Sequence, residues 1–256
     1  TPARSRVKQA SASPLLIEGK KGAIAALILA HGSATHQAHP HLTALSEALN
    51  RQKIMTLRFN FAYRKAGRAF PGPMTESVSD YLTAADHFGA SRLKLPLFFG
   101  GHSYGGRVAT HAASAVQTAS NPPRISKQLK GMVAFSLPLH PRGKPHLKRW
   151  SHLQGNTLPL IILAGDRDPM IENEQAVTFL QTQPNAELCW IAGADHGFKQ
   201  TKAAIKNQGS AYFYAAKAAR RWRIQLDNTL QRLTLEQISG VFCSLNVKHQ
   251  SPGTGN

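Results

Sequence analysis

Short apolar runs alternate with longer amphipathic stretches along most of the chain. Each run has the length of a β-strand, and the stretches between the runs have the length and composition of helices. Strands are predicted at 24–30, 54–59, 95–100, 131–136, 158–164 and 186–191. Helices are predicted at 41–51, 76–90, 104–117 and 172–182, and a last helix is expected within 209–235. This alternation is typical of an α/β fold, in which helices cover both faces of a mostly parallel sheet.

The two ends of the chain lack this alternation. Residues 1–14 and 249–256 are polar, small or contain Pro and Gly, so mobile ends are expected there. We therefore predict a basic N-terminal segment at 1–21, one α/β domain at 22–235 and a C-terminal tail at 236–256. A length of 256 residues and a hydrophobic content of 42% suit one domain with a sizeable core.

The sequence also indicates in which cellular compartment the protein is expected. No apolar run reaches the roughly 20 residues of a membrane-spanning helix, and the basic N-terminus lacks the apolar core of a secretory signal. A soluble, cytoplasmic protein is expected. The two cysteines, Cys189 and Cys243, give no disulfide framework and are expected to be reduced. The chain begins with Thr1 rather than Met, which leaves open whether its N-terminus is complete.

A G-x-S-x-G motif, Gly101 to Gly105, lies between the strand predicted at 95–100 and the helix predicted at 104–117. The two glycines allow a sharp turn that exposes the hydroxyl of Ser103 at the carboxyl end of the sheet. The amide of Tyr104 can point at the same place. Because the motif has the correct strand and helix flanks, it is far more specific than the pattern alone, and Ser103 is the candidate nucleophile.

Two later loops carry the groups that a serine nucleophile needs. Asp166 and Asp168 follow the strand predicted at 158–164, and His196 follows the next strand. A histidine must accept the serine proton, and a carboxylate must orient that histidine. We prefer Asp168 as the acid because its later position in the turn gives it more freedom to reach His196, whereas Asp166 could hold the turn together. Asp195 is adjacent to His196, so its side chain is expected to diverge from the ring.

An oxyanion hole needs a second donor besides the Tyr104 amide, and one such donor is worth about 3 kcal/mol. The expected source is the loop that follows the strand at 24–30. Ser33 is the first choice in this loop and Ala34 the second. The whole site is thus expected to be built from loops before residue 200.

Several longer motifs also occur in order between about residues 22 and 200. They are Ile28-Leu29-Ala30-His31-Gly32, Leu57-Arg58-Phe59-Asn60-Phe61 with Tyr63 and Ala66-Gly67-Arg68, Ser103-Tyr104-Gly105-Gly106-Arg107, Leu137-Pro138-Leu139-His140-Pro141 with Gly143-Lys144-Pro145, Gly165-Asp166-Arg167-Asp168-Pro169, and Asp195-His196. In these motifs the chain resembles the α/β-hydrolases, and more closely the small family related to dienelactone hydrolases that includes the Tex-type homologues.

The resemblance implies an α/β-hydrolase fold with Ser103 as nucleophile, Asp168 as acid and His196 as base, in agreement with the reasoning from the residues. Two positions depart from the family pattern. His102 stands where Lys or Arg is common, and Tyr104 stands where Met is common. Both departures leave the substrate open.

The predicted pocket is open. Only about twenty residues separate the strand at 131–136 from the strand at 158–164, too few for a large cap domain, so small soluble substrates are favoured. Four residues of the matched motifs are candidate substrate contacts: His31, Arg58, Arg68 and His140. The segment after the Pro-Leu-His-Pro motif could overhang Ser103 with several basic residues, or it could be a solvated surface loop; they are Arg142, Lys144, Lys148 and Arg149. An anionic substrate therefore stays open.

The net charge of +18 is concentrated towards both ends of the chain. Ala216 to Arg223 forms a basic helical face that includes Trp222, which could bind polyanions weakly and without specificity or could simply be solvated. No recognised nucleic-acid-binding module is present in the sequence. A cluster of four histidines lacks the spacing of known metal sites, so no metal or other cofactor is expected; it comprises His31, His36, His39 and His41.

The leading hypothesis is a metal-independent, esterase-like serine hydrolase that cleaves a small ester, thioester or activated acyl substrate through an acyl-enzyme intermediate. The alternative is a catalytically silent α/β-hydrolase scaffold that binds a protein or a polyanion through its basic termini.

Overall fold

A computed structural model describes residues 15–88 and 94–232. The chain divides into two compact units, Thr1–Arg220 and Arg221–Asn256, and the features below belong to the first, apart from the part of the last helix beyond Arg220. The ends predicted at 1–14 and 236–256, together with Cys243, lie outside the described residues.

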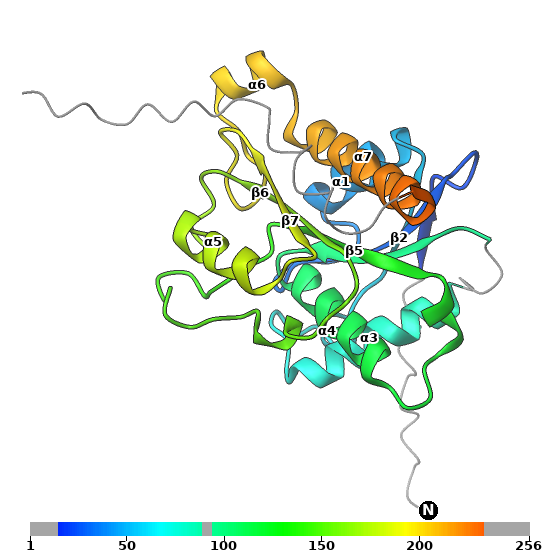
Figure 1. Cartoon of the computed structure of the whole chain (residues 1–256). Coiled ribbons are helices and arrows are strands. Elements are labelled where there is room, and N and C mark those ends of the chain that lie inside the picture. Colours follow the sequence, from blue (N-terminus) through cyan, green and yellow to red (C-terminus); the bar gives the residue numbers. More distant parts are fainter. Residues whose placement is uncertain (1–14, 89–93, 233–256) are drawn as a thin grey trace, which may run out of the picture. The chain divides into compact units, whose positions relative to one another are not determined.

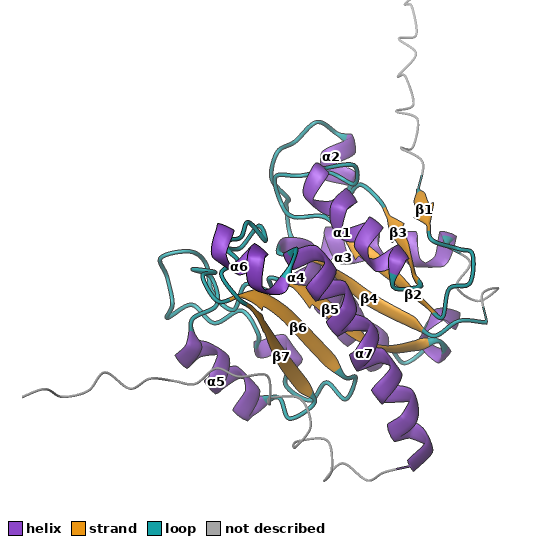
Figure 2. Ribbon diagram, turned by 90° about the horizontal axis from the view of Figure 1, so that it is seen from above, coloured by secondary structure: helices purple, strands orange, loops and turns teal. Residues whose placement is uncertain are grey.

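A seven-stranded sheet with the order β1-β3-β2-β4-β5-β6-β7 forms the framework of this unit (Figure 2). Its strands are β1 (Leu16–Glu18), β2 (Ala25–Ala30), β3 (Ile54–Arg58), β4 (Leu97–His102), β5 (Leu129–Phe135), β6 (Leu160–Gly165) and β7 (Ala186–Ile191). β1 pairs antiparallel with β3, and all the other neighbouring strands pair in parallel. Parallel strands place their carboxyl ends at one edge of the sheet, and the loops that follow β2, β4, β6 and β7 therefore lie at that edge.

Helices cover both faces of the sheet. They are α1 (Pro40–Arg51), α2 (Ala62–Lys65), α3 (Met74–His87), α4 (Tyr104–Thr118), α5 (Asn173–Thr182), α6 (Lys202–Gln208) and α7 (Ala211–Arg232), with short 3-10 helices η2 (Arg124–Lys127) and η3 (Ser151–Leu153). α3 and α4 lie on one face, and α1 and the first turns of α7 lie on the other (Figure 1). Every residue of β2, β3, β4 and β6 is buried. Burial on both faces explains why β2 and β6 appear in the sequence as continuous apolar runs rather than as alternating ones. The predicted α/β fold class is confirmed.

The structure also differs from the predictions. The sheet begins at Leu16, inside the segment 1–21 that was predicted to precede the domain, because β1 pairs with β3. A strand of three residues is too short to give a periodic signal. The short helices α2 and α6 were not predicted for the same reason. β4 extends through His102, beyond the predicted end at residue 100, because the glycines before Ser103 still pair with β5.

The segment between β5 and β6 contains turns and the single turn of η3, so no cap domain covers this part of the fold. Among the described helices, none combines the length and the apolar character that crossing a membrane requires.

Candidate active site

Ser103 lies on a sharp turn between β4 and α4, with a φ of 54° and a ψ of −116°. The neighbouring glycines are required by close packing against β2. A Cβ atom at Gly105 would lie 2.3 Å from the carbonyl oxygen of Ala30, and one at Gly101 would lie 2.5 Å from the carbonyl carbon of Gly105. Any side chain at either position would therefore collide with backbone. The turn fixes Ser103 at the carboxyl end of β4.

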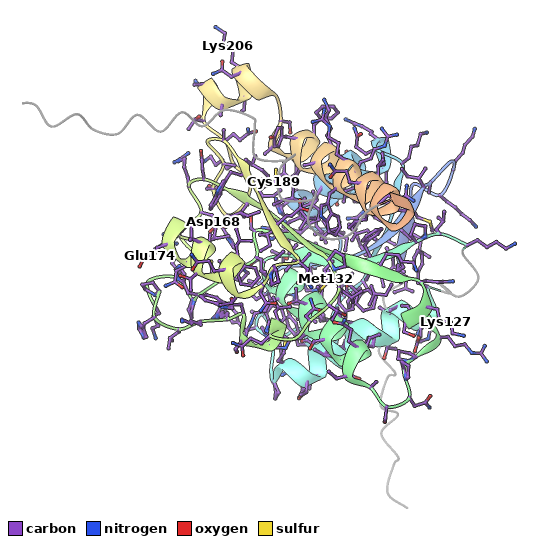
Figure 3. All side chains as sticks on the ribbon, in the orientation of Figure 1. Lys127, Met132, Asp168, Glu174, Cys189 and Lys206 are labelled. Carbon is purple, nitrogen blue, oxygen red and sulfur yellow. The ribbon has the colours of Figure 1, made fainter. Side chains whose placement is uncertain are left out.

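Three side chains from three loops meet at this turn. His196 Nε2 lies 2.8 Å from Ser103 Oγ, and His196 Nδ1 lies 2.7 Å from Asp168 Oδ2. Asp168 lies between β6 and α5 (Figure 3). This residue is 4% exposed. Because a carboxylate can only accept, Nδ1–H donates to Asp168 and Nε2 is left to accept the serine proton. The arrangement has the connectivity of a nucleophile, a base and an orienting acid.

The two other candidate acids lie elsewhere. Asp166 is exposed. Asp195 Oδ1 accepts the amides of Gly197 and Lys199, each at 2.9 Å, so this carboxylate shapes the loop that carries His196. Asp168 is thus the carboxylate that contacts the His196 ring.

Two backbone regions beside Ser103 can offer donors to an oxyanion. Tyr104 is the first residue of α4, and the amides of a first helical turn have no partner within the helix. The loop after β2 approaches the same turn, since a Cβ at Gly105 would lie 2.7 Å from the carbonyl oxygen of His31. Within this loop the Ser33 carbonyl accepts the Tyr63 hydroxyl at 2.6 Å, which fixes its course. Both Ser33 and Ala34 remain candidates for the second donor.

His31 belongs to this loop and is fully buried. Its Nδ1–H donates to the Gly32 carbonyl at 2.7 Å, and its Nε2 accepts the Phe61 amide at 3.4 Å. Burial lowers the pKa of His31 to about 4, so the ring is neutral at pH 7. The expectation that His31 contacts substrate is corrected, because both ring nitrogens are engaged with backbone.

Arg58 was also expected to contact substrate, and the structure contradicts this. It is 2% exposed, and its guanidinium donates to Glu18 Oε2 at 2.8 Å, to the Gln37 carbonyl at 2.6 Å and to Thr43 Oγ1 at 2.8 Å. These bonds tie β1, β3 and α1 together. Arg58 is a structural residue.

The remaining two substrate-contact candidates are His140 and Arg68. His140 is fully buried, with Nδ1 at 2.8 Å from the Pro141 carbonyl, so it cannot meet a substrate that arrives from solvent. Arg68 is largely exposed and lies 4.0 Å from Glu76. The structure therefore corrects the expectation for His140 and gives Arg68 a surface position.

The four clustered histidines are divided between different surroundings. The rings of His36 and His39 have centroids 6.0 Å apart, whereas His41 packs on His102 and His31 is buried beside Phe61. Within residues 15–88 and 94–232, no group of three or more His, Cys, Asp or Glu side chains is arranged to hold a metal ion.

His102, which the sequence marked only as a departure from the family pattern, contacts the loop of His196. Its Nε2–H donates to the His196 carbonyl at 2.8 Å. The His41 ring packs against it with centroids 4.1 Å apart, and His41 Nδ1 lies 2.9 Å from the Tyr212 hydroxyl of α7. Burial, followed by the nearby rings of His41 and His196, lowers the pKa of His102 well below its ordinary value. A neutral His102 therefore holds the backbone at His196, and Tyr212 adds a residue beyond position 200 to the surroundings of the site.

If His196 acts as the base that the sequence predicts, replacing His102 with Leu should lower kcat by about tenfold or more, because a small displacement of a catalytic group has a large effect on rate. Replacement with Gln should restore most of kcat, since its side-chain amide can donate to the same carbonyl. Steady-state kinetics and circular dichroism would measure both variants. An unchanged kcat in a folded His102→Leu variant would show that this hydrogen bond does not position His196.

Acid should destabilise the folded chain before most carboxylates are protonated. Burial lowers the pKa of His31 to about 4 and that of His41 to about 4, from an ordinary value of 6.5. Below pH 6.5 the unfolded chain therefore binds more protons at these two histidines than the folded chain does. The free energy of unfolding consequently declines as pH falls from 6.5 towards 4. We expect the Tm to fall by several degrees between about pH 7 and pH 5. A Tm that stays constant over this interval would contradict the expectation.

Comparison with known proteins identifies related chains. A family described as alpha/beta hydrolase domain matches residues 23–223. The esterase Est1E from Butyrivibrio proteoclasticus, solved with bound ferulic acid, is 16% identical, with a TM-score of 0.61 over 84% of this chain and 95% of that one. A dienelactone hydrolase from Anabaena variabilis is 20% identical, with a TM-score of 0.60 over 80% of this chain and 88% of that one. A serine hydrolase without a lid from Xanthomonas campestris is 18% identical, with a TM-score of 0.57 over 83% of this chain and 91% of that one. At these identities the solved structures show a shared fold.

Proposed function

The chain belongs to the alpha/beta hydrolase domain family and is a hydrolase, and on that premise we propose that it is a serine hydrolase that cleaves a small ester, thioester or activated acyl substrate. The observation that carries the proposal is the hydrogen-bonded series from Asp168 through His196 to Ser103, with distances of 2.7 and 2.8 Å. Serine, histidine and a buried carboxylate in this connectivity provide nucleophilic catalysis.

In the first half of the reaction Ser103 Oγ attacks the acyl carbon while its proton passes to His196 Nε2. The negative charge that develops on the acyl oxygen accepts hydrogen bonds from the Tyr104 amide and from an amide of the loop at Ser33 and Ala34. Asp168 stabilises the imidazolium and stays ionised. The bond to the leaving group then breaks, and His196 returns the proton to the departing oxygen or sulfur, which leaves Ser103 acylated.

In the second half a water molecule attacks the acyl-enzyme, and His196 accepts its proton. The Ser103 ester bond then breaks, and the same proton returns to Oγ. The short segment between β5 and β6 supports a small substrate, because it has only the single turn of η3 with which to cover the site.

Covalent labelling tests the proposal directly. A fluorophosphonate should react with Ser103 because the hydroxyl is paired with His196, and mass spectrometry of the digested protein should locate the adduct. Ser103→Ala should not be labelled. If the folded wild-type protein is not labelled, the alternative of a silent scaffold that binds a protein or a polyanion through its basic termini takes precedence.

A further inference from the structure

A cluster of four basic side chains extends from the turn at Ser103 along α4. Arg107 is one helical turn beyond Ser103, whose carbonyl accepts the Arg107 amide at 3.0 Å, and His111 is one turn further. Arg149 and His152 come from the segment between β5 and β6. The rings of His111 and His152 are stacked, with centroids 3.5 Å apart and an angle of 12° between their planes.

Hydrogen bonds hold this segment against α4. His152 Nε2 lies 2.8 Å from Thr110 Oγ1, and the Ser114 hydroxyl donates to the His152 carbonyl at 3.3 Å. The Arg149 amide donates to the Leu139 carbonyl at 2.9 Å. The cluster is therefore a built part of the fold and its side chains are partly buried.

No acidic side chain among the described residues balances the positive charge of the cluster, since neither Arg107 nor Arg149 forms an ion pair there. Burial, followed by the charge of Arg149, lowers the pKa of Arg107, so the two guanidinium groups are close enough to repel each other. Among the described residues, Arg107 Nε is buried and donates to no acceptor. Native proteins pair most buried donors, and a bound anion would supply the acceptor here.

The two histidines do not supply charge. Burial, followed by the charge of Arg107, lowers the pKa of His111 to about 4. Burial, followed by the neighbouring His111 and Arg107, lowers the pKa of His152 to about 3. Both rings are neutral at pH 7. The charge of the cluster therefore resides on Arg107 and Arg149.

The position of Arg107 on α4 favours an approach to Ser103. Helical side chains generally lean towards the helix N-terminus, and for Arg107 this is the direction of the turn that contains Ser103. The Tyr104 phenol, in that same turn, lies close enough to Arg107 to influence its pKa.

We propose that Arg107 and Arg149 form an anion-binding subsite beside Ser103, which binds a carboxylate carried by the substrate. The planar guanidinium matches the two oxygens of a carboxylate and binds it in a fixed orientation. The proposal rests on the proposed hydrolase function and specifies its substrate as an anionic ester or thioester.

Two matched pairs of esters test the subsite. Monomethyl succinate has a carboxylate in place of the terminal methyl group of methyl butyrate, on the acyl side. Acetylglycolate has a carboxylate in place of the terminal methyl group of ethyl acetate, on the alcohol side. The wild-type protein should prefer at least one anion over its neutral partner by about tenfold or more in kcat/KM. The pair that shows the preference identifies the side on which the carboxylate binds.

Arg107→Gln should remove that preference, with a loss of about 10- to 100-fold for the anion and a change within about threefold for the neutral ester. Arg149→Gln should act in the same direction. Arg51→Gln makes the same charge change at an exposed position at the end of α1 and should leave the preference intact. Equal losses for charged and neutral esters, or no preference in the wild-type protein, would overturn the subsite.

A second measurement needs no variant at the cluster. Free succinate should inhibit methyl butyrate hydrolysis by the wild-type protein competitively, and a lack of competition would count against the subsite.

If no ester is hydrolysed and no fluorophosphonate adduct forms, the proposed function fails. Calorimetry of succinate binding to the wild-type and Arg149→Gln proteins then decides the subsite separately, because Arg149-dependent binding supports it and its absence refutes it.

Discussion

Ser103→Ala and His196→Ala are each expected to lower kcat/KM for the best ester by at least about 10³-fold, because residues that act as one catalytic unit lose most of their effect when any one is removed. In each variant the hydrogen bond between His196 Nε2 and Ser103 Oγ, 2.8 Å long in the wild-type protein, is lost. The Tm should stay close to the wild-type value, since neither side chain belongs to the apolar core. Initial rates and thermal melts of the purified variants provide the measurements.

Matched controls separate this loss from general damage. Ser151→Ala and His87→Ala remove the same side chains at exposed positions and should leave kcat/KM within about twofold of wild type. Retention of more than about a tenth of wild-type activity in Ser103→Ala or His196→Ala would remove that residue from the catalytic assignment.

Asp168→Asn should lower kcat by about 10³- to 10⁴-fold, because an amide in place of the carboxylate disfavours the imidazole tautomer that the mechanism needs. The carboxylate accepts His196 Nδ1–H at 2.7 Å, and its other oxygen accepts the Met170 amide at 2.9 Å. An asparagine can keep the second bond while it weakens the first. The fold should therefore survive while the base loses its orientation, which kcat and circular dichroism together would show.

Asp166→Asn is the control for this prediction, since Asp166 lies in the same turn and is exposed. It should reduce kcat by no more than about twofold. If Asp166→Asn were more damaging than Asp168→Asn in a folded protein, the acid would have to be reassigned.

The parts of the molecule that the sequence predicts are those governed by local constraints. β2 and β6 are buried on both faces, so every position is apolar or small and the strands are visible as unbroken runs. Close backbone contacts around Ser103 require glycine at 101 and 105. The G-x-S-x-G motif contains both glycines, so it can be recognised from the sequence. Local chemistry of this kind predicts an element without knowledge of its neighbours.

The parts that the sequence does not predict depend on partners far along the chain. Arg58 belongs to a matched motif, but its role is decided by Glu18, forty positions earlier, in a strand too short to be recognised. His102 likewise acquires its contact from the backbone of His196, on a different loop. Tyr212 reaches His41 only because the start of α7 folds back beside α1. Residue types alone carry no signal for such pairings.

At Ser103 the backbone conformation lowers the stability of the fold, whereas the side chain serves the proposed activity. A φ of 54° in a residue with a Cβ costs on the order of 1–3 kcal/mol, and that energy has to be recovered from packing elsewhere. Glycine would adopt this conformation with little strain, so a chain optimised for folding alone would replace the serine there. The proposed chemistry thus needs a side chain at the point of the turn where a side chain is least favourable. Ser103→Gly should therefore yield a protein that melts at a higher temperature but has lost its nucleophile.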